Sequence, residues 1–246
     1  MDKQTAIIIP ARYDSSRLRG KPLIEVGGKP IIQWVFEKAV KSNLADRVII
    51  ATDNEQIYET SLMFGAEAEM TLSTHNSGSD RIAEVAERHP EIGYIINLQG
   101  DEPLINPDNI NKVIELVKQG DADISTLVRK IEDKKEAQNE NLVKCVFNNL
   151  GYAMYFSRSP IPYECNVGHS DYYGHLGIYG YTREALFKMT NASQTSLELS
   201  ESLEQLRALE MGMKIKVAVV GDIPIGIDTI EDLNRFKERV MVDGLV

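Results

Sequence analysis

The alternation of short apolar runs with longer amphipathic stretches is the feature that most constrains how this chain can fold. Runs rich in β-branched residues at 5–10, 47–52 and 94–99 predict buried strands. The stretches between them, 30–42, 54–66 and 78–89, place apolar residues at helical spacing, and their candidate N-caps are Asp53 and either Ser77 or Ser79. Strand and helix in alternation favour an α/β fold built on a parallel sheet.

The second half of the chain departs from this alternation. From Ala137 onward, strand-like runs follow one another with little helix between them, which predicts a smaller β-rich arm at roughly 140–185. A helix over 196–212, a strand over 214–220 and a helix over 229–241 then restore the pattern. Because no repeat or flexible linker interrupts the chain, we expect one domain over 1–246 that carries the arm.

Charge and hydropathy exclude several classes of partner. Lys+Arg 27 against Asp+Glu 37 gives a net charge of −10, which disfavours nucleic acid as a partner. The sequence contains no long uncharged apolar stretch for a membrane span and no secretory signal at its start, so we expect a cytoplasmic protein. The two cysteines, Cys145 and Cys165, have neither metal-ligand nor redox spacing and are interpreted as ordinary thiols.

A basic loop directly follows the first predicted strand. It holds Arg12, Arg17, Arg19 and Lys21, and Gly20 would allow the backbone to approach an anion closely. Loops that leave the carboxyl ends of parallel strands form the ligand sites of open α/β sheets, so these cations favour polyphosphate binding over a merely solvated loop. The spacing matches neither an ATPase phosphate-binding loop nor a dinucleotide fingerprint.

Two acidic loops follow later strands. Asp101 ends the run "YIINLQGD", and Asp228 precedes the last predicted helix. Each aspartate has an ordinary alternative as a turn or capping residue. Together they could form a two-carboxylate site for Mg²⁺, which prefers carboxylate and phosphate oxygens.

An ordered set of segments gives the chain a family resemblance. The segments are "IIIPARYDSSRLRGKPLIEVGGKPII", "VIIATDNEQI", "THNSGSDRIAEV", "INLQGDEPLI", "GYAMYFSRSPIP", "HLGIYGYTREAL", "LEQLRALEMGMKIKVAV" and "IDTIEDL". In this order, and over nearly the whole length, they resemble the CMP-Kdo synthetases, which are 3-deoxy-manno-octulosonate (Kdo) cytidylyltransferases. The resemblance implies a Rossmann-like nucleotide-binding sheet with helices on both faces, and a β-rich arm that forms a homodimer. It also implies CTP and a 3-deoxy-2-keto sugar acid as substrates, Mg²⁺ as cofactor, and a place in lipopolysaccharide biosynthesis.

The resemblance carries roles over to individual residues. Lys21, Arg17, Asp101 and Asp228 match catalytic positions, and the two aspartates match the metal ligands. Nucleotide-binding positions match Pro10, Ala11, Arg12, Arg17, Lys21, Ser77, Gly78, Arg81 and Gln99. Sugar-binding positions match Gln99, Arg158, His175, Tyr179, Glu204 and Gln205. From the residues alone, His175 and Tyr179 could equally be core or interface aromatics on one face of a strand, and Arg158 could simply snorkel to solvent.

Four positions depart from the family pattern. Arg19 and Ile230 stand where proline is usual, Ser196 also replaces a proline, and Leu199 replaces a histidine. The change at Leu199 could alter sugar preference, because the same predicted helix leads into the sugar-binding positions. The alternative substrates are therefore 8-amino-3,8-dideoxy-manno-octulosonate or another sugar acid. A noncatalytic CTP-binding sensor is a less favoured alternative from a different class of protein.

Overall fold

The computed structural model describes residues 3–14, 18–166, 168–221 and 226–244. Two compact units make up the chain: residues 1–111 with 224–246, and residues 112–223. The division falls within helix α4 (Pro107–Lys118). The arm expected at 140–185 belongs to the second unit, and the expectation of a single domain stays a prediction.

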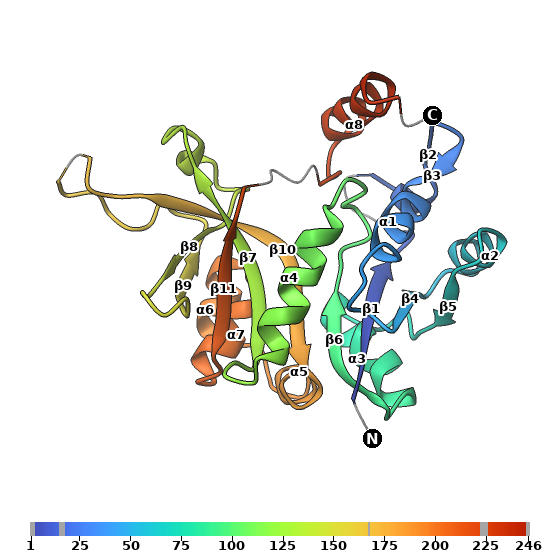
Figure 1. Cartoon of the computed structure of the whole chain (residues 1–246), viewed down its shortest axis with the longest axis horizontal. Helices are drawn as coiled ribbons and strands as arrows, with labels where there is room; N and C mark the ends of the chain where they lie inside the picture. Colours follow the sequence, from blue (N-terminus) through green and yellow to red (C-terminus); the bar gives the residue numbers. More distant parts are fainter. Residues whose placement is uncertain (1–2, 15–17, 167, 222–225, 245–246) are drawn as a thin grey trace. The chain divides into compact units, whose positions relative to one another are not determined.

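The first unit is built on four parallel strands in the order β6-β1-β4-β5 (Figure 1). They are β1 (Gln4–Ala11), β4 (Arg47–Thr52), β5 (Glu67–Met70) and β6 (Ile92–Asn97). The connecting helices are α1 (Ile31–Ala39), α2 (Glu55–Met63) and α3 (Gly78–Arg88). The chain moves outward from β1 to β5 and then returns to β6, so right-handed crossovers place α3 on the opposite face from α1 and α2. The predicted α/β fold with helices on both faces is confirmed.

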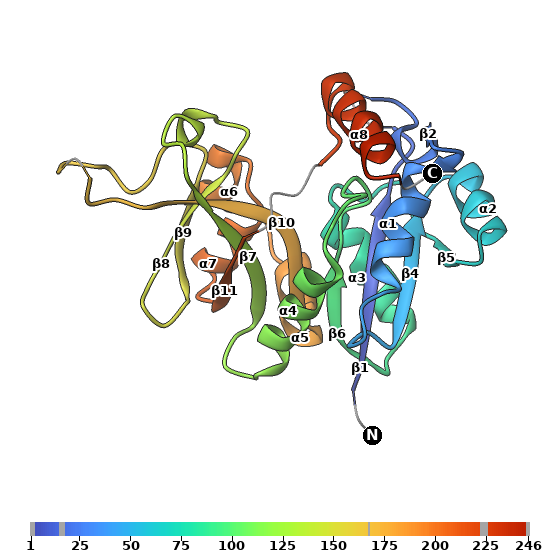
Figure 2. The same ribbon diagram turned by 45° about the horizontal axis from the view of Figure 1, so that its top comes forward.

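The last helix, α8 (Ile230–Val242), packs back onto the start of the chain (Figure 2). Its Leu233, Phe236 and Val240 are buried in one cluster with Ile31 and Trp34. The Trp34 and Phe236 rings meet edge to face, with their centroids 5.7 Å apart. This apolar contact fixes residues 226–229, which precede the helix, beside loops from the N-terminal half. The first unit also contains a short turn of helix, η1 (Lys21–Leu23), and the hairpin β2 (Glu25–Val26) and β3 (Lys29–Pro30).

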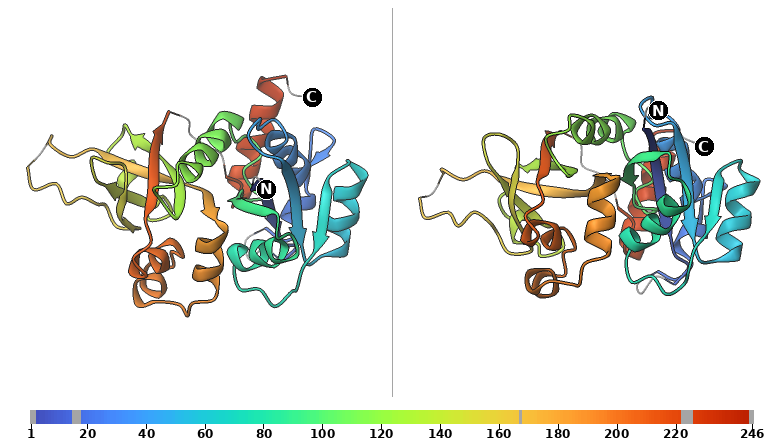
Figure 3. Two further views of the ribbon diagram at one scale, coloured as in Figure 1. Left: turned by 60° about the horizontal axis from the view of Figure 1, so that its bottom comes forward. Right: turned by 90° about the horizontal axis from the view of Figure 1, so that it is seen from below.

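The second unit centres on three strands in the order β11-β7-β10. β7 (Ile124–Ile131) runs antiparallel to β10 (Tyr172–Thr182) and parallel to β11 (Ile215–Val220). The hairpin of β8 (Lys144–Phe147) and β9 (Ala153–Ser157) joins β10. Figure 3 shows the helices α5 (Arg183–Thr190), α6 (Ser196–Glu201) and α7 (Gln205–Glu210) of this unit. A further short turn, η2, covers Glu136–Gln138.

The prediction of one helix over 196–212 is wrong, because this segment forms two helices, α6 and α7. Ser202 adopts a left-handed conformation with φ +52° and ends α6, and α7 begins at Gln205. Such a residue stops the helical hydrogen-bond ladder. A second difference is the cap of α2: Asn54, not Asp53, accepts a hydrogen bond from Ile57 N at 3.1 Å. Ser77 caps α3 as one of the two predicted alternatives.

Candidate active site

Three loops of the first unit meet at the carboxyl end of β1. Gly100, which follows β6, lies so close to Pro10 that an added Cβ would come within 3.0 Å of the Pro10 carbonyl oxygen. At Gly78, the first residue of α3, a Cβ would lie 3.3 Å from Pro10 Cγ. A Cβ at either position would force Pro10 to shift by a few tenths of an ångström, so glycine suits both close approaches. The basic loop, the "NLQGD" loop and the start of α3 therefore form one cluster.

Lys21 joins both predicted metal ligands. Its Nζ atom lies 2.8 Å from Asp101 Oδ2 and 3.3 Å from Asp228 Oδ1, and it donates to the Ile227 carbonyl oxygen at 2.7 Å. Lys21 itself is buried, whereas half of the Asp228 side chain remains accessible. The structure thus brings together two carboxylates that are separated by 127 positions (228 − 101) around a single cation.

The position of Asp228 depends on the segment that precedes α8. Ile227 N donates to the Asp101 carbonyl oxygen at 2.9 Å, which ties the two acidic loops together through the backbone. Thr229 and Asp232 then form a capping box at the start of α8. Thr229, not Asp228, is the cap of α8, and the Asp228 carboxylate contacts Lys21.

A pocket of about 270 Å³ opens beside this cluster. Six of the predicted nucleotide-binding residues line it: Pro10, Ala11, Arg12, Lys21, Gly78 and Gln99. Gln99 is also a predicted sugar-binding residue, and the predicted metal ligand Asp101 lines the pocket as well. Arg12 is held at the rim by a hydrogen bond of 3.0 Å to the Asn76 carbonyl oxygen. Gln99 donates to Asn97 Oδ1 at 3.2 Å. The pocket is lined by Arg12 and Lys21, by Asp14 and Asp101, and by two glycines; its cations and glycines are suited to a polyphosphate, and Asp101 to a bound divalent ion.

Glu102 is a buried carboxyl that sequence reasoning missed. It is 7% exposed, and its Oε2 atom has no hydrogen-bond partner among the described residues. Burial, and secondly the charge of Asp101, raises the pKa of Glu102 to about 8. Glu102 is therefore mostly protonated near pH 7 and adds little negative charge beside the pocket. The only sequence feature that could have indicated Glu102 is its position next to Asp101 in the loop after β6.

Arg81, a predicted nucleotide-binding residue, lies in the first turn of α3. Arg81 is fully buried; its guanidinium donates to Asp53 Oδ2 at 2.8 Å and to Thr71 Oγ1, so these contacts hold α3 against the ends of β4 and β5. Its assignment to the nucleotide stays a prediction. Arg17 lies outside the described residues.

The second unit places His175 and Tyr179 next to each other on β10, with ring centroids 5.2 Å apart. The Thr126 hydroxyl donates to the Ile178 carbonyl at 2.8 Å, which leaves its oxygen to accept from His175 Nε2 at 2.9 Å. Burial lowers the pKa of His175 to about 3 and raises that of Tyr179 well above its ordinary value. Both side chains are therefore neutral hydrogen-bonding groups near pH 7, and neither is a simple hydrophobic core residue.

The remaining predicted sugar-binding residues lie in the same unit. Arg158 follows β9, and its guanidinium donates to the carbonyl oxygens of Glu201 at 2.8 Å and Glu140 at 3.1 Å. Gln205 is buried at the first position of α7. Glu204 precedes it and lies 3.8 Å from Arg207. Arg158 is thus anchored rather than free to snorkel.

The departures from the family pattern fall mainly on exposed positions. Arg19 pairs with Asp14 at 3.4 Å, and both side chains are largely in water. The exposed fraction is 60% for Leu199 and 52% for Ile230. Ser196 donates to Glu210 at 3.3 Å. None of these substitutions removes a group of the Lys21 cluster.

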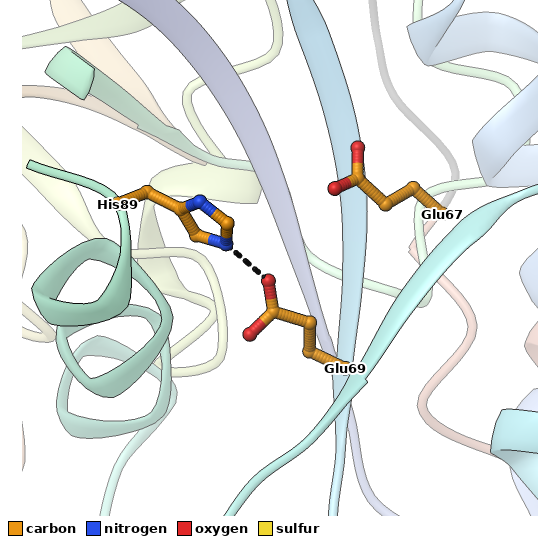
Figure 4. Close-up of side chains that lie close together, drawn as sticks. All are labelled: Glu67, Glu69 and His89. Carbon is orange, nitrogen blue, oxygen red and sulfur yellow. Dashed lines mark hydrogen bonds and ion pairs between the residues drawn. The ribbon is translucent and has the colours of Figure 1, made fainter. Parts of the chain in front are cut away.

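A second acidic cluster lies away from these residues, where Glu67 and Glu69 of β5 approach His89 (Figure 4). His89 Nε2 contacts Glu69, and its Nδ1 lies 3.1 Å from Arg47. Arg47 also pairs with Glu67 and Glu91. The carboxylates already have cationic partners, so the cluster is interpreted as an ion-pair network that joins β4, β5 and α3.

Known proteins similar to this chain are cytidylyltransferases. The cytidylyltransferase family model matches residues 6–215. The 3-deoxy-manno-octulosonate cytidylyltransferase of Fusobacterium nucleatum is 49% identical, with 93% of each chain covered. That of Thermodesulfovibrio yellowstonii is 46% identical over 93% of this chain and 95% of the relative. A solved CMP:2-keto-3-deoxy-manno-octonic acid synthetase complexed with CTP is 38% identical and superposes with a TM-score of 0.94, covering 98% of this chain and 100% of its own.

Fold and family match together make the chain a cytidylyltransferase, and therefore a nucleotidyltransferase enzyme. At this identity and coverage it belongs to the 3-deoxy-manno-octulosonate cytidylyltransferase family, as the ordered sequence segments predicted. Among the described residues, each helix is too short or too polar to cross a bilayer.

Proposed function

We propose that this enzyme transfers CMP from CTP to the anomeric hydroxyl of Kdo, which gives CMP-Kdo and pyrophosphate for lipopolysaccharide biosynthesis. The observation that carries the proposal is the convergence of Lys21, Asp101 and Asp228 beside a pocket of about 270 Å³. The names of the relatives and the CTP complex of the similar solved structure support the two substrates.

Asp101 and Asp228 would hold Mg²⁺. The donor set fits, because two carboxylates reach one common cation, the Lys21 ammonium, at 2.8 and 3.3 Å. Magnesium prefers such oxygen ligands and completes its shell with substrate phosphates and water. When bound, the ion would neutralise negative charge on the triphosphate and polarise a phosphoryl oxygen.

The chain's own residues would position the triphosphate. Lys21 and Arg12 line the pocket and would bind phosphate oxygens by charge-assisted hydrogen bonds, and Arg17 is proposed for the same task. The attacking hydroxyl would displace pyrophosphate directly. Burial raises the pKa of Cys145 to about 12, so this thiol is not a nucleophile that could form a covalent intermediate.

The second unit would bind the sugar acid. Arg158 would pair with its carboxylate, and neutral His175 and Tyr179 would hydrogen-bond to its hydroxyls, since a desolvated neutral donor binds a hydroxyl without the cost of burying a charge. Glu204 and Gln205 complete the proposed set in this unit.

We also propose a cytoplasmic homodimer formed through the β-rich arm. The hairpin of β8 and β9 exposes apolar side chains: Met154 is 64% exposed and Leu150 72%. Exposed apolar groups on a short two-stranded extension are typical of a surface that a second chain covers.

The test is pyrophosphate release by the purified enzyme with CTP and Mg²⁺ and a panel of sugar acids. We expect the highest kcat/KM with Kdo, a lower value with 8-amino-3,8-dideoxy-manno-octulosonate and the lowest with sialic acid. A higher value for either of the other acids would replace Kdo as the substrate. CTP binding without pyrophosphate release from any acid would favour a sensor and contradict the proposed catalysis.

A further inference from the structure

Arg158 carries a positive charge that backbone oxygens hold in place without neutralising it. Its guanidinium donates to the carbonyls of Glu201, Glu140 and, at 3.5 Å, Ser202. Among the described residues it forms no ion pair with a carboxylate. Lys144, buried nearby, also donates to carbonyls, including that of Arg158. The Glu201 carboxylate binds the Arg158 backbone N–H and not the guanidinium, so the guanidinium could still form an ion pair with an anion at this end of β9.

Glu201 binds both the backbone and the guanidinium of Arg158. Its carboxylate accepts from Arg158 N at 2.9 Å and from Ser157 Oγ at 2.6 Å. Its backbone carbonyl accepts from Arg158 Nε at 2.8 Å. One residue therefore fixes both the backbone from which the Arg158 side chain starts and the guanidinium at its far end.

The end of α6 makes this double contact possible. The left-handed conformation of Ser202, φ +52°, stops the helix immediately after Glu201. Carbonyls in the last turn of a helix have no intrahelical partner, so the Glu201 carbonyl is available to a side chain. The end of α6 after Glu201, which the sequence did not predict, thus leaves the Glu201 carbonyl oxygen able to accept from Arg158.

We infer that Glu201 is a positioning residue: it sets the affinity for the sugar-acid carboxylate by orienting Arg158, without touching the sugar itself. This inference rests on the proposed function, in which Arg158 pairs with that carboxylate. A bidentate contact between a guanidinium and a carboxylate depends strongly on orientation, so small rotations of Arg158 weaken it. The CTP pocket, built from residues of the first unit, does not depend on Glu201.

The first experiment is steady-state kinetics of Glu201→Gln. Glutamine keeps the size and the backbone carbonyl, but it offers one acceptor oxygen where glutamate offers two. We expect the KM for Kdo to rise about tenfold, as is typical for a charge-assisted network that loses one contact. The KM for CTP and kcat should stay within about twofold. A purely structural role would move both KM values or neither.

Glu210→Gln is the matched control. Glu210, in the neighbouring helix α7, also accepts from a serine hydroxyl, that of Ser196, and from a backbone N–H, that of Leu197. Among the described residues, Glu210 forms no hydrogen bond with a predicted sugar-binding residue, so both KM values should equal those of the wild type. A rise in the KM for Kdo in this variant as large as that in Glu201→Gln would overturn the inference.

A double-mutant cycle separates this inference from the proposed function. In an Arg158→Ala background, Glu201→Gln should have no further effect on the KM for Kdo, because the group that it orients is gone. Arg158→Lys, which keeps the charge but not the planar fork, provides a second background. Full additivity would show that Glu201 acts independently and overturn the inference alone. An unchanged KM for Kdo in both Arg158 variants would overturn the sugar-site assignment and the inference with it.

Discussion

Lys21 in the first unit and Arg158 in the second are both cations partly removed from water, but their partners differ. Lys21 lies between two carboxylates, whereas Arg158 has only carbonyl partners among the described residues. In the first unit, the proposed Mg²⁺ and triphosphate would replace partners that Lys21, Asp101 and Asp228 already have. In the second, the proposed sugar carboxylate would be the first anion to pair with the Arg158 guanidinium. Removing a carboxylate should therefore have very different effects in the two units.

The largest expected effect is that of Asp101→Asn on turnover. An amide is a poor Mg²⁺ ligand and leaves Lys21 with one carboxylate fewer, so we expect kcat to fall by about a thousandfold or more. The free energy of unfolding should change little, because the side chain is partly exposed. Pyrophosphate release and urea unfolding measure the two quantities.

Asp121→Asn provides the control for that comparison. Asp121 also pairs with a lysine, Lys216, at 3.0 Å, but it belongs to the second unit and has no predicted ligand role. Its kcat should equal that of the wild type. Unchanged turnover in Asp101→Asn, or an equal loss in Asp121→Asn, would contradict the metal role of Asp101.

The next largest effect concerns stability in the second unit, where Arg207, unlike Arg158, has a buried carboxylate partner. Glu198 accepts from Arg207 Nε at 2.7 Å, and both side chains are less than a tenth exposed. Glu198→Gln leaves the arginine charge buried and should lower the free energy of unfolding by about 3 kcal/mol. Urea denaturation measures it. The half-exposed pair of Lys112 and Glu115 is the control, since Glu115→Gln should cost less than about 0.5 kcal/mol.

A smaller effect is expected for Lys21→Ala. Loss of the ammonium should raise the KM for CTP by roughly tenfold to a hundredfold, because one charge-assisted contact to phosphate disappears. The KM for Kdo should change by less than about threefold. Initial rates with each substrate varied in turn measure both constants. Equal increases in the two constants would contradict the assignment of Lys21 to the nucleotide.

The smallest effect is a pH dependence from His175. Because burial lowers its pKa to about 3 from an ordinary value of 6.5, the unfolded chain binds the proton more readily than the folded protein does. The contribution of neutral His175 is fully present above pH 6.5 and is lost as the pH falls. The wild type should lose stability relative to His175→Gln as the pH falls from 6 to 4. Urea unfolding curves at several pH values measure the difference, and parallel pH profiles for the two proteins would contradict it.

Sequence patterns located the elements whose side chains are mostly buried. β1, β4 and β6 are continuous apolar runs, and their boundaries agree closely with the predicted ones. β5 was missed, because "EAEM" is an edge strand whose charged residues form ion pairs on the surface rather than a hydrophobic pattern. The break at Ser202 was missed as well, because the flanking residues favour helix without interruption and tertiary contacts decide the break.

The candidate site shows the same limit. Charged loops after predicted strands, and then the family motifs, pointed to Lys21, Asp101 and Asp228, and the structure brings these three side chains together. Glu201 could not be found in this way: in a continuous predicted helix it is one more acidic surface residue. Its role depends on where the helix stops, which is a property of the packed chain and not of the local sequence.

The dependence of the first-unit cluster on Asp228 also has a consequence for biosynthesis. Translation proceeds from the N-terminus, so the ribosome makes Lys21 and Asp101 long before the aspartate that completes the cluster and the helix that covers Trp34. Nascent or prematurely terminated chains that lack α8 would expose the indole to solvent and would lack one of the two proposed metal ligands. The proposed site is thus complete only in the final stage of synthesis.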